Sequence, residues 1–197
     1  MINVTKQNKP SYECMIIAET SLSLANQEQN SSLKNHHLYT GIIFLCFAVE
    51  AMFIFYRKQV EPGYNKKDDR TKRKQKHKET SRLCGIDDML GTREYQTIDK
   101  CFSIRDSIAH GDSFSSCFNF IPSGEENYTI PILSHPSEQF RAITPSLLKD
   151  AICAAKHIDT IIHSTGYNTA YSSNEQQFIP PLTSAFGHSG ISTWHIE

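Results

Sequence analysis

The sequence predicts an all-α protein, and two observations support this fold class. Apolar residues recur at helical spacing in several segments, and capping or breaking residues stand at the ends of those segments. The most apolar segment is hydrophobic on nearly all sides and stops before Pro62-Gly63. We expect a bundle of about four or five helices with this segment at its centre. The expected helix ranges are 12–26, 38–58, 80–90, 93–109 and 144–166.

Capping residues set the limits of the last two helices. Thr92 is a suitable N-cap for the helix over 93–109, and Gly111 can supply the left-handed residue that ends it. Thr144 followed by Pro145 is a typical helix start, because proline is favoured at the first helical position. This last helix is expected to end near Gly166.

One change of period interrupts the helices. Two short β-prone runs, 117–121 and 128–133, flank a turn-forming stretch, so we expect a small β-hairpin inserted over 116–133. Residues 1–166 form one predicted helical domain. Residues 167–197 are rich in Ser, Asn and Thr and are predicted to be a C-terminal arm or tail.

The cysteines and the polar start of the chain predict a cytoplasmic protein. The six cysteines include no CxxC pair, which is typical of reduced thiols in the cytosol. The segment 38–56 is 19 residues long with Glu50 as its one charged residue, which is just long enough to span a bilayer. We favour a buried core helix and no membrane, because the other amphipathic segments can cover it.

Positive charge is concentrated in residues 66–78, which we expect to form a basic loop. This window carries +6, whereas the whole chain carries -1. The run is either a solvated loop or a surface that grips an RNA backbone, and the two readings are about equally supported. No aromatic residue interleaves it, so base stacking is not indicated. The candidate RNA-binding residues are Lys72, Arg73, Lys74 and Lys76.

The strongest chemical signal is Arg105 followed by His110 at the expected end of a helix. Arginine binds phosphate through a planar fork of donors, and histidine can accept or donate a proton near neutral pH. Positions five apart on a helix differ by about 140° around its axis. The two side chains can therefore meet if the helix ends near Ala109, or if two copies of the chain meet across a two-fold axis.

This segment resembles the HEPN superfamily (higher eukaryotes and prokaryotes nucleotide-binding). The signature of that family is Arg, then four to six residues, then His, often with Asn, Asp or His directly after the Arg. Arg105, Asp106 and His110 occupy those positions here, and Ala-Val-Glu-Ala at 48–51 lies in a preceding helix. The resemblance covers residues 11–166.

The resemblance implies a homodimeric endoribonuclease that needs no metal or cofactor, of a kind found in toxin and anti-phage systems. His110 would take the proton from an RNA 2′-hydroxyl, and Arg105 would stabilise charge on the attacked phosphate. The products would be a 2′,3′-cyclic phosphate and a 5′-hydroxyl. Asp106 would orient the His or Arg, and Ser107 could donate to phosphate.

Two features limit what the resemblance implies. Family toxins paired with small nucleotidyltransferase antitoxins often carry Tyr two residues after the His, and this chain has Asp112 there. An antitoxin or other regulator remains an expectation, without that modification. Many members of the superfamily bind without cutting, so the alternative is a non-catalytic module that binds RNA, a nucleotide or a protein.

Cys153 and His157 could be half of a metal site, but no further ligands stand at a matching spacing, so no metal is expected.

Glu50 is the second residue of interest, because its helical neighbours are apolar and a buried carboxylate needs a partner. One hypothesis pairs it with Arg105 or places it in the active cleft. An equally supported alternative pairs it with Arg57 or Arg93, or points it into an interface.

Overall fold

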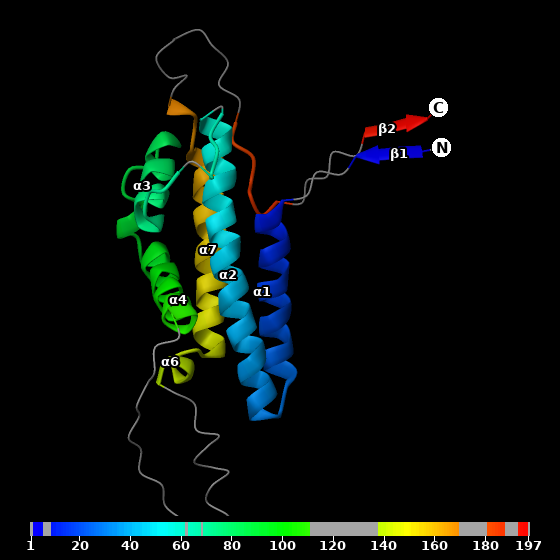
Figure 1. The fold of residues 1–197 in the computed structure, drawn as a ribbon, viewed down its shortest axis with the longest axis vertical. Helices are drawn as coiled ribbons and strands as arrows, with labels where there is room; N and C mark the ends of the chain where they lie inside the picture. The colour runs from blue at the N-terminus through cyan, green and yellow to red at the C-terminus, as the bar shows by residue number, and fades with distance from the viewer. Residues whose placement is uncertain are drawn as a thin grey trace, which may run out of the picture.

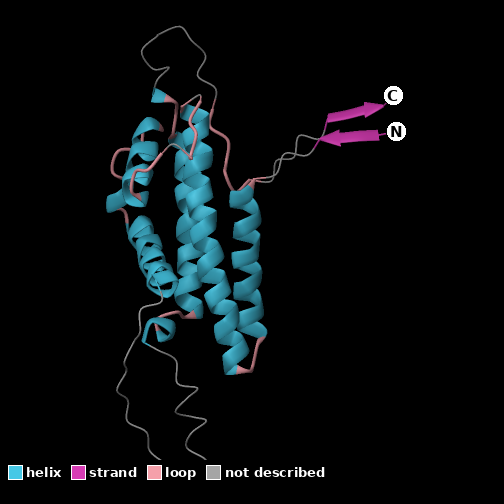
Figure 2. Ribbon diagram, viewed as in Figure 1, coloured by secondary structure: helices cyan, strands magenta, loops and turns pink. Residues whose placement is uncertain are grey.

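The protein is described by a computed structural model that covers residues 2–5, 9–61, 63–67, 69–110, 138–169, 181–187 and 193–196. These residues are mainly helical, as predicted (Figure 2). The helices are α1 (Pro10–Gln27), α2 (Ser31–Val60), α3 (Arg73–Leu83), α4 (Arg93–His110), α6 (Glu138–Arg141) and α7 (Pro145–Thr165), with a 3-10 turn at Met89–Gly91. Two short strands, β1 (Ile2–Thr5) and β2 (Thr193–Ile196), pair antiparallel.

The long helices pack around α2, which contacts α1, α3, α4 and α7 (Figure 1). α1 and α2 form an antiparallel pair, and α3 and α4 follow one another along the opposite side of the bundle. Large buried side chains from these helices make one continuous core. Examples are Leu45, Met52, Phe102, Leu148 and Ile158.

α2 is the central helix that the sequence predicts, but it begins seven residues earlier than expected. Asn30 caps it by accepting from the backbone N–H groups of Ser32 and Leu33, and this signal outweighs the polar start of the helix. Among the described residues, α2 alone is long and apolar enough to cross a membrane, and half of its most apolar stretch is buried inside the bundle.

α2 and α7 approach closely at Gly41. A Cβ atom added at this glycine would lie 2.4 Å from Cδ2 of Leu148, a fully buried residue of α7, and 3.4 Å from Cβ of Ser21 on α1. The missing side chain therefore lets three helices meet at one level of the core.

The third helix differs from the prediction. α3 begins at Arg73 rather than at residue 80, so half of the expected basic loop over 66–78 is helical. Its buried residues are His77, Thr80 and Ser81, which carry no apolar period. The His77 ring stacks on Phe53 of α2 at 4.0 Å between centroids, and its Nδ1 lies 2.8 Å from the Tyr95 hydroxyl of α4. A histidine thus occupies a core position that an apolar residue normally fills.

The two predicted caps of the later helices are confirmed. The Thr92 hydroxyl accepts from the N–H of Tyr95 at 3.2 Å, and the Thr144 hydroxyl accepts from the N–H of Leu147 at 3.1 Å. α4 continues through His110. The predicted hairpin over 116–133 and the expected stop at Gly111 lie outside the described residues.

Part of the predicted C-terminal arm, residues 181–187, is fixed to the bundle by Asp159 of α7. This carboxylate is buried and accepts three hydrogen bonds: from the Tyr56 hydroxyl at 2.6 Å, the Ser184 hydroxyl at 2.5 Å and the Ala185 N–H at 2.7 Å. We call this arrangement the Asp159 clasp.

The start of α1 binds the same segment. Lys9 Nζ donates to the Ser184 carbonyl, and the Ser11 hydroxyl donates to the Ala185 carbonyl, both at 2.8 Å. Segments from the two halves of the chain therefore meet at this end of the bundle.

Candidate functional site

The predicted motif lies in a network of two arginines and two carboxylates. Arg105 donates to Glu50 of α2 at 2.7 Å and lies 3.2 Å from the carboxylate of its neighbour Asp106. Arg73, the first residue of α3, holds the same Asp106 with both ends of its guanidinium, at 2.8 and 3.2 Å. The network therefore joins α2, α3 and α4 through charged groups.

Arg105 is mostly enclosed within this network. Its side chain is 20% exposed, and its Nε is buried without a hydrogen-bond acceptor among the described residues. The guanidinium also lies 5.6 Å from the Phe102 ring centroid and 6.0 Å from that of Phe47. Burial raises the pKa of the nearby Cys46 thiol, so this group is not a competing anion.

Asp106 is held as a carboxylate. Burial on its own would raise its pKa, but the hydrogen bonds and charge of Arg73, followed by the charges of Arg105 and His110, lower the pKa of Asp106 overall. Its negative charge is therefore kept across the neutral range, where it fixes both arginines.

His110 is the last residue of α4 and its side chain is exposed. Because the helix runs through this position, His110 stands one turn beyond Asp106, about 140° around the axis from Arg105. α4 therefore ends one residue later than expected, and the meeting of Arg105 with His110 within one chain stays a prediction. Ser107, which lies between Arg105 and His110 in the sequence, is partly buried.

The four predicted RNA-binding residues differ in their surroundings. Arg73 binds Asp106, Lys74 lies 3.1 Å from Asp99, and Lys76 donates to the Asp69 carbonyl at 2.7 Å. Lys72 is exposed and has no ion-pair partner in the part of the chain that the structure describes. Three of the four predicted RNA-binding side chains therefore already make contacts within the protein.

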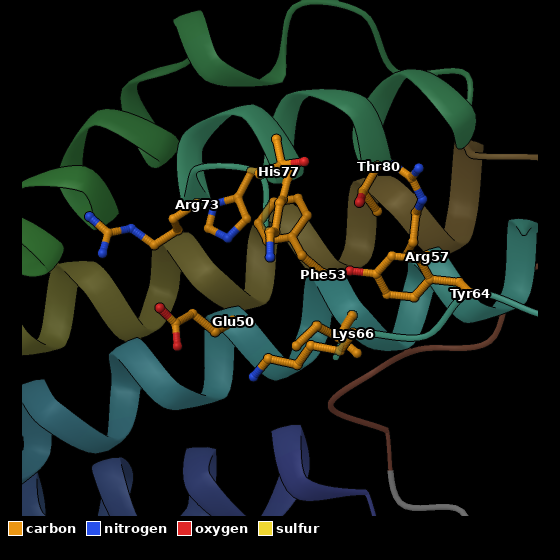
Figure 3. Close-up of a pocket in the computed structure, with 11 residues that line it drawn as sticks. Glu50, Phe53, Arg57, Tyr64, Lys66, Arg73, His77 and Thr80 are labelled. Atoms are coloured by element: carbon orange, nitrogen blue, oxygen red, sulfur yellow. The ribbon is translucent and has the colours of Figure 1, made fainter. Parts of the chain in front are cut away.

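A pocket of about 140 Å³ opens beside this network, between α2 and α3 (Figure 3). Glu50 and Arg73 belong both to the network and to the pocket wall. The cations that line the pocket are Arg57, Lys66, Arg73 and Lys76. We call this cavity the basic pocket.

Sequence reasoning did not identify Arg57, Tyr64 and Lys66 as one site. Arg57 pairs with Glu61 and lies 3.5 Å from Glu79, and its guanidinium lies 5.3 Å from the Tyr64 ring centroid. The only signal was Arg57 as an alternative partner of Glu50. Their convergence depends on the turn between α2 and α3, which no motif predicts.

No group of three or more potential metal ligands occurs among the described residues. Cys153 is exposed on α7, and His157 one turn later has its Nδ1 3.1 Å from a Glu94 carboxylate oxygen of α4. This contact gives His157 a partner other than a metal.

Comparisons with protein-family models, with curated proteins and with solved structures found no match to this chain. The resemblance to the HEPN superfamily therefore rests on the motif residues and their helical setting.

Proposed function

We propose that the protein is a metal-independent endoribonuclease of HEPN type that acts as a homodimer in the cytosol. One observation supports this most directly. Arg105 is fixed by Glu50 and Asp106 near the end of α4, and the exposed His110 lies on the last turn of the same helix. A fixed cation and an accessible imidazole are the two groups that phosphodiester cleavage without a metal requires.

The proposed reaction is a transfer within the RNA strand. His110 removes the proton from a 2′-hydroxyl, whose oxygen then forms a bond to the adjacent phosphorus while the bond from phosphorus to the 5′-oxygen breaks. Arg105 neutralises charge on the phosphoryl oxygens. The leaving 5′-oxygen takes up the proton that His110 removed, directly or through water, and the products are a 2′,3′-cyclic phosphate and a 5′-hydroxyl.

The geometry favours a site shared by two chains. On an ideal helix, positions 105 and 110 lie about 140° apart around the axis, which disfavours contact of one phosphate with both Arg105 and His110 of a single α4. A two-fold axis near the ends of two α4 helices would place Arg105 opposite His110 of the partner subunit. Phe47, which is 42% exposed next to Arg105, supplies apolar surface for such a contact.

RNA must compete with Glu50 for Arg105. The pair is partly exposed, and a phosphate offers the same bidentate geometry to a guanidinium as a carboxylate does. In the proposed mechanism the scissile phosphate replaces Glu50, while Asp106 keeps Arg105 in place.

The first experiment measures RNA cleavage by the purified protein in EDTA. The wild type is expected to cut RNA and leave 2′,3′-cyclic ends, and His110→Ala is expected to be inactive while keeping its circular dichroism spectrum. His36→Ala, at an exposed histidine of α2, serves as the matched control and should cut normally. Cleavage that survives in His110→Ala would refute the assignment.

A mixing experiment tests the shared site. Arg105→Ala and His110→Ala chains, each inactive alone, are unfolded together and refolded. If each site takes Arg105 from one chain and His110 from the other, the mixed dimer keeps one intact site and about a quarter of the activity returns. Absence of recovery, with dimers present, would show that both groups act within one chain.

A second function is favoured by the contacts of Arg105. Two carboxylates occupy its guanidinium, so the site could also serve a module that binds RNA, a nucleotide or a protein without cutting. RNA binding by the wild type with no cleavage under any ionic condition would support this alternative. Growth arrest on expression in cells, relieved by His110→Ala, would instead support a toxin or anti-phage effector.

A further inference from the structure

We propose that the basic pocket binds the phosphate group of a small phosphomonoester, at a site separate from His110. The pocket lies between α2 and α3, and Figure 3 shows Lys66, Arg57 and Tyr64 among the residues that line it. Four cations line it against one carboxylate, Glu50. A phosphate dianion is the ligand that such a set of donors matches best.

The pocket is large enough to enclose only one end of a ligand. About 140 Å³ is well below the roughly 300–1,000 Å³ of a site that encloses a drug-sized molecule. A phosphate with part of an attached sugar fits, and the remainder of the ligand would extend past Tyr64 into solvent. Phe53 and His77 supply aromatic rings to the pocket wall, which suit the sugar carbons.

The cations that line the pocket outnumber the carboxylates that line it. Glu50, the lining carboxylate, is neutralised by Arg105 at 2.7 Å. Arg57, Arg73 and Lys76 pair with Glu79, Asp106 and Asp69, and none of these three carboxylates lines the pocket. Lys66 is exposed and has no ion-pair partner among the residues described.

The start of α3 adds to this preference. Its N-cap, Lys72, makes no side-chain capping bond, and the first turn contains no acidic residue. A helix N-terminus is normally stabilised by negative charge, whereas this one begins with Arg73 and Lys74. Thr71 and Arg73 line the pocket, so a bound phosphate would lie beside the uncapped turn and add to the negative charge of Asp69, which accepts from the Thr71 N–H at 2.9 Å.

Burial of His77, followed by the charges of Arg73 and Lys76, lowers its pKa to about 3. The ring is therefore a neutral part of the wall near pH 7. It adds no charge to the pocket, so the cations at the rim determine which ligands bind.

Occupation of the basic pocket would act on the motif through two residues. A phosphate would draw Arg73 away from Asp106 and repel Glu50 from the pocket, and these are the groups that hold Arg105 and Asp106. This effect on cleavage rests on the proposed ribonuclease function, whereas binding itself does not.

The experiment measures binding by calorimetry with inorganic phosphate, ribose 5-phosphate and adenosine 5′-monophosphate, using the intact chain. Ribose and adenosine are the unphosphorylated controls. The phosphorylated compounds are expected to bind, and Lys66→Met is expected to weaken binding about tenfold, which is the effect of losing one charge-assisted hydrogen bond. Lys58→Met removes an exposed charge from α2 outside the pocket and should bind as the wild type does.

Each outcome decides the proposal. Binding that needs the phosphate and falls in Lys66→Met alone supports it, whether or not RNA is cleaved. Equal binding by Lys66→Met and Lys58→Met overturns it in favour of general charge attraction. No binding by any of the three phosphate compounds overturns it outright.

Discussion

Glu50 lies in the apolar middle of α2 with its carboxylate directed to Arg105 of α4. Removing its charge leaves the mostly enclosed Arg105 with Asp106 as its one carboxylate partner among the described residues. We expect Glu50→Gln to lower the free energy of unfolding by about 1–2 kcal/mol. Urea unfolding measures this, and Asp87→Asn, at an exposed carboxylate away from the network, should change it little. If Glu50→Gln altered neither stability nor RNA cleavage, Glu50 would have no role.

His77 predicts a pH dependence of stability. Its pKa is lowered to about 3 in the folded protein, mainly by burial, against 6.5 for an ordinary histidine. Between these values the unfolded chain binds a proton that the folded chain does not, so stability is full above pH 6.5 and falls as the pH drops toward 3. One such proton corresponds to about 1.4 kcal/mol per pH unit.

The test compares variants rather than the absolute slope, because carboxylates titrate in the same window. His77→Gln retains a polar group near Tyr95 and should show a shallower loss of stability between about pH 4 and 6 than the wild type. His36→Gln, at an exposed histidine, should follow the wild-type curve. Parallel curves for all three proteins would mean that His77 already carries its proton when folded.

At the scale of helices, α3 is attached to α4 by one well-formed ion pair and one looser one. Arg73 binds Asp106 with two hydrogen bonds and lies 4.1 Å from the Phe102 ring centroid. We expect Arg73→Lys to cost about 1 kcal/mol, because lysine keeps the charge but loses the fork. Hydrogen exchange of the α3 amides should accelerate. Lys74→Met, which breaks the exposed pair with Asp99, should cost less than about 0.5 kcal/mol.

The contact of α2 with α7 at Gly41 gives a second prediction for the helices. Alanine there would gain helix propensity but would force Leu148 to move, since the added Cβ lies 2.4 Å from its Cδ2. Overpacking of this kind costs about 1–3 kcal/mol, which exceeds the propensity gain of about 1. We expect a lower melting temperature for Gly41→Ala. Gly91→Ala meets no atom within 4 Å and should melt near the wild type; the reverse order would contradict the close packing.

How well the sequence predicts an element depends on what its buried face contains. α7 was predicted from Thr144 and Pro145 onward because its cap is local and its buried face is aliphatic. The sequence predicts a start for α3 that is seven residues too late, because its buried residues His77, Thr80 and Ser81 show no hydrophobic periodicity.

The candidate site was predictable to the same limited extent. The contact of Glu50 with Arg105 was one of the alternatives, because an isolated carboxylate on an apolar helix requires a cation. Arg73 with Asp106 was not foreseen, since the charge run from which Arg73 comes is typical of solvated loops as well. The two residues lie on different helices, far apart in the sequence, so their pairing depends on tertiary packing that a local pattern does not encode.

At the scale of the whole molecule, the Asp159 clasp joins α2, α7 and residues 181–187 through one buried carboxylate. Asp159→Ala would leave the buried Tyr56 hydroxyl and the Ala185 N–H without this acceptor. We expect a loss of about 2–4 kcal/mol in the free energy of unfolding. Asp150→Ala, at an exposed carboxylate two turns earlier on α7, is the control and should cost far less. A clasp variant as stable as that control would show that residues 181–187 are held by other contacts.

The order of the helices along the chain could be changed by circular permutation. The contacts that allow this join Lys9 and Ser11 to Ser184 and Ala185. They bring the two halves together at one end of the bundle, and beyond them β1 pairs with β2, with Ile2 opposite Ile196. A short turn between these strands could close the backbone, and the tight connection between α1 and α2 could then be cut to give new ends. In such a circular permutant α2 would come first and α1 last.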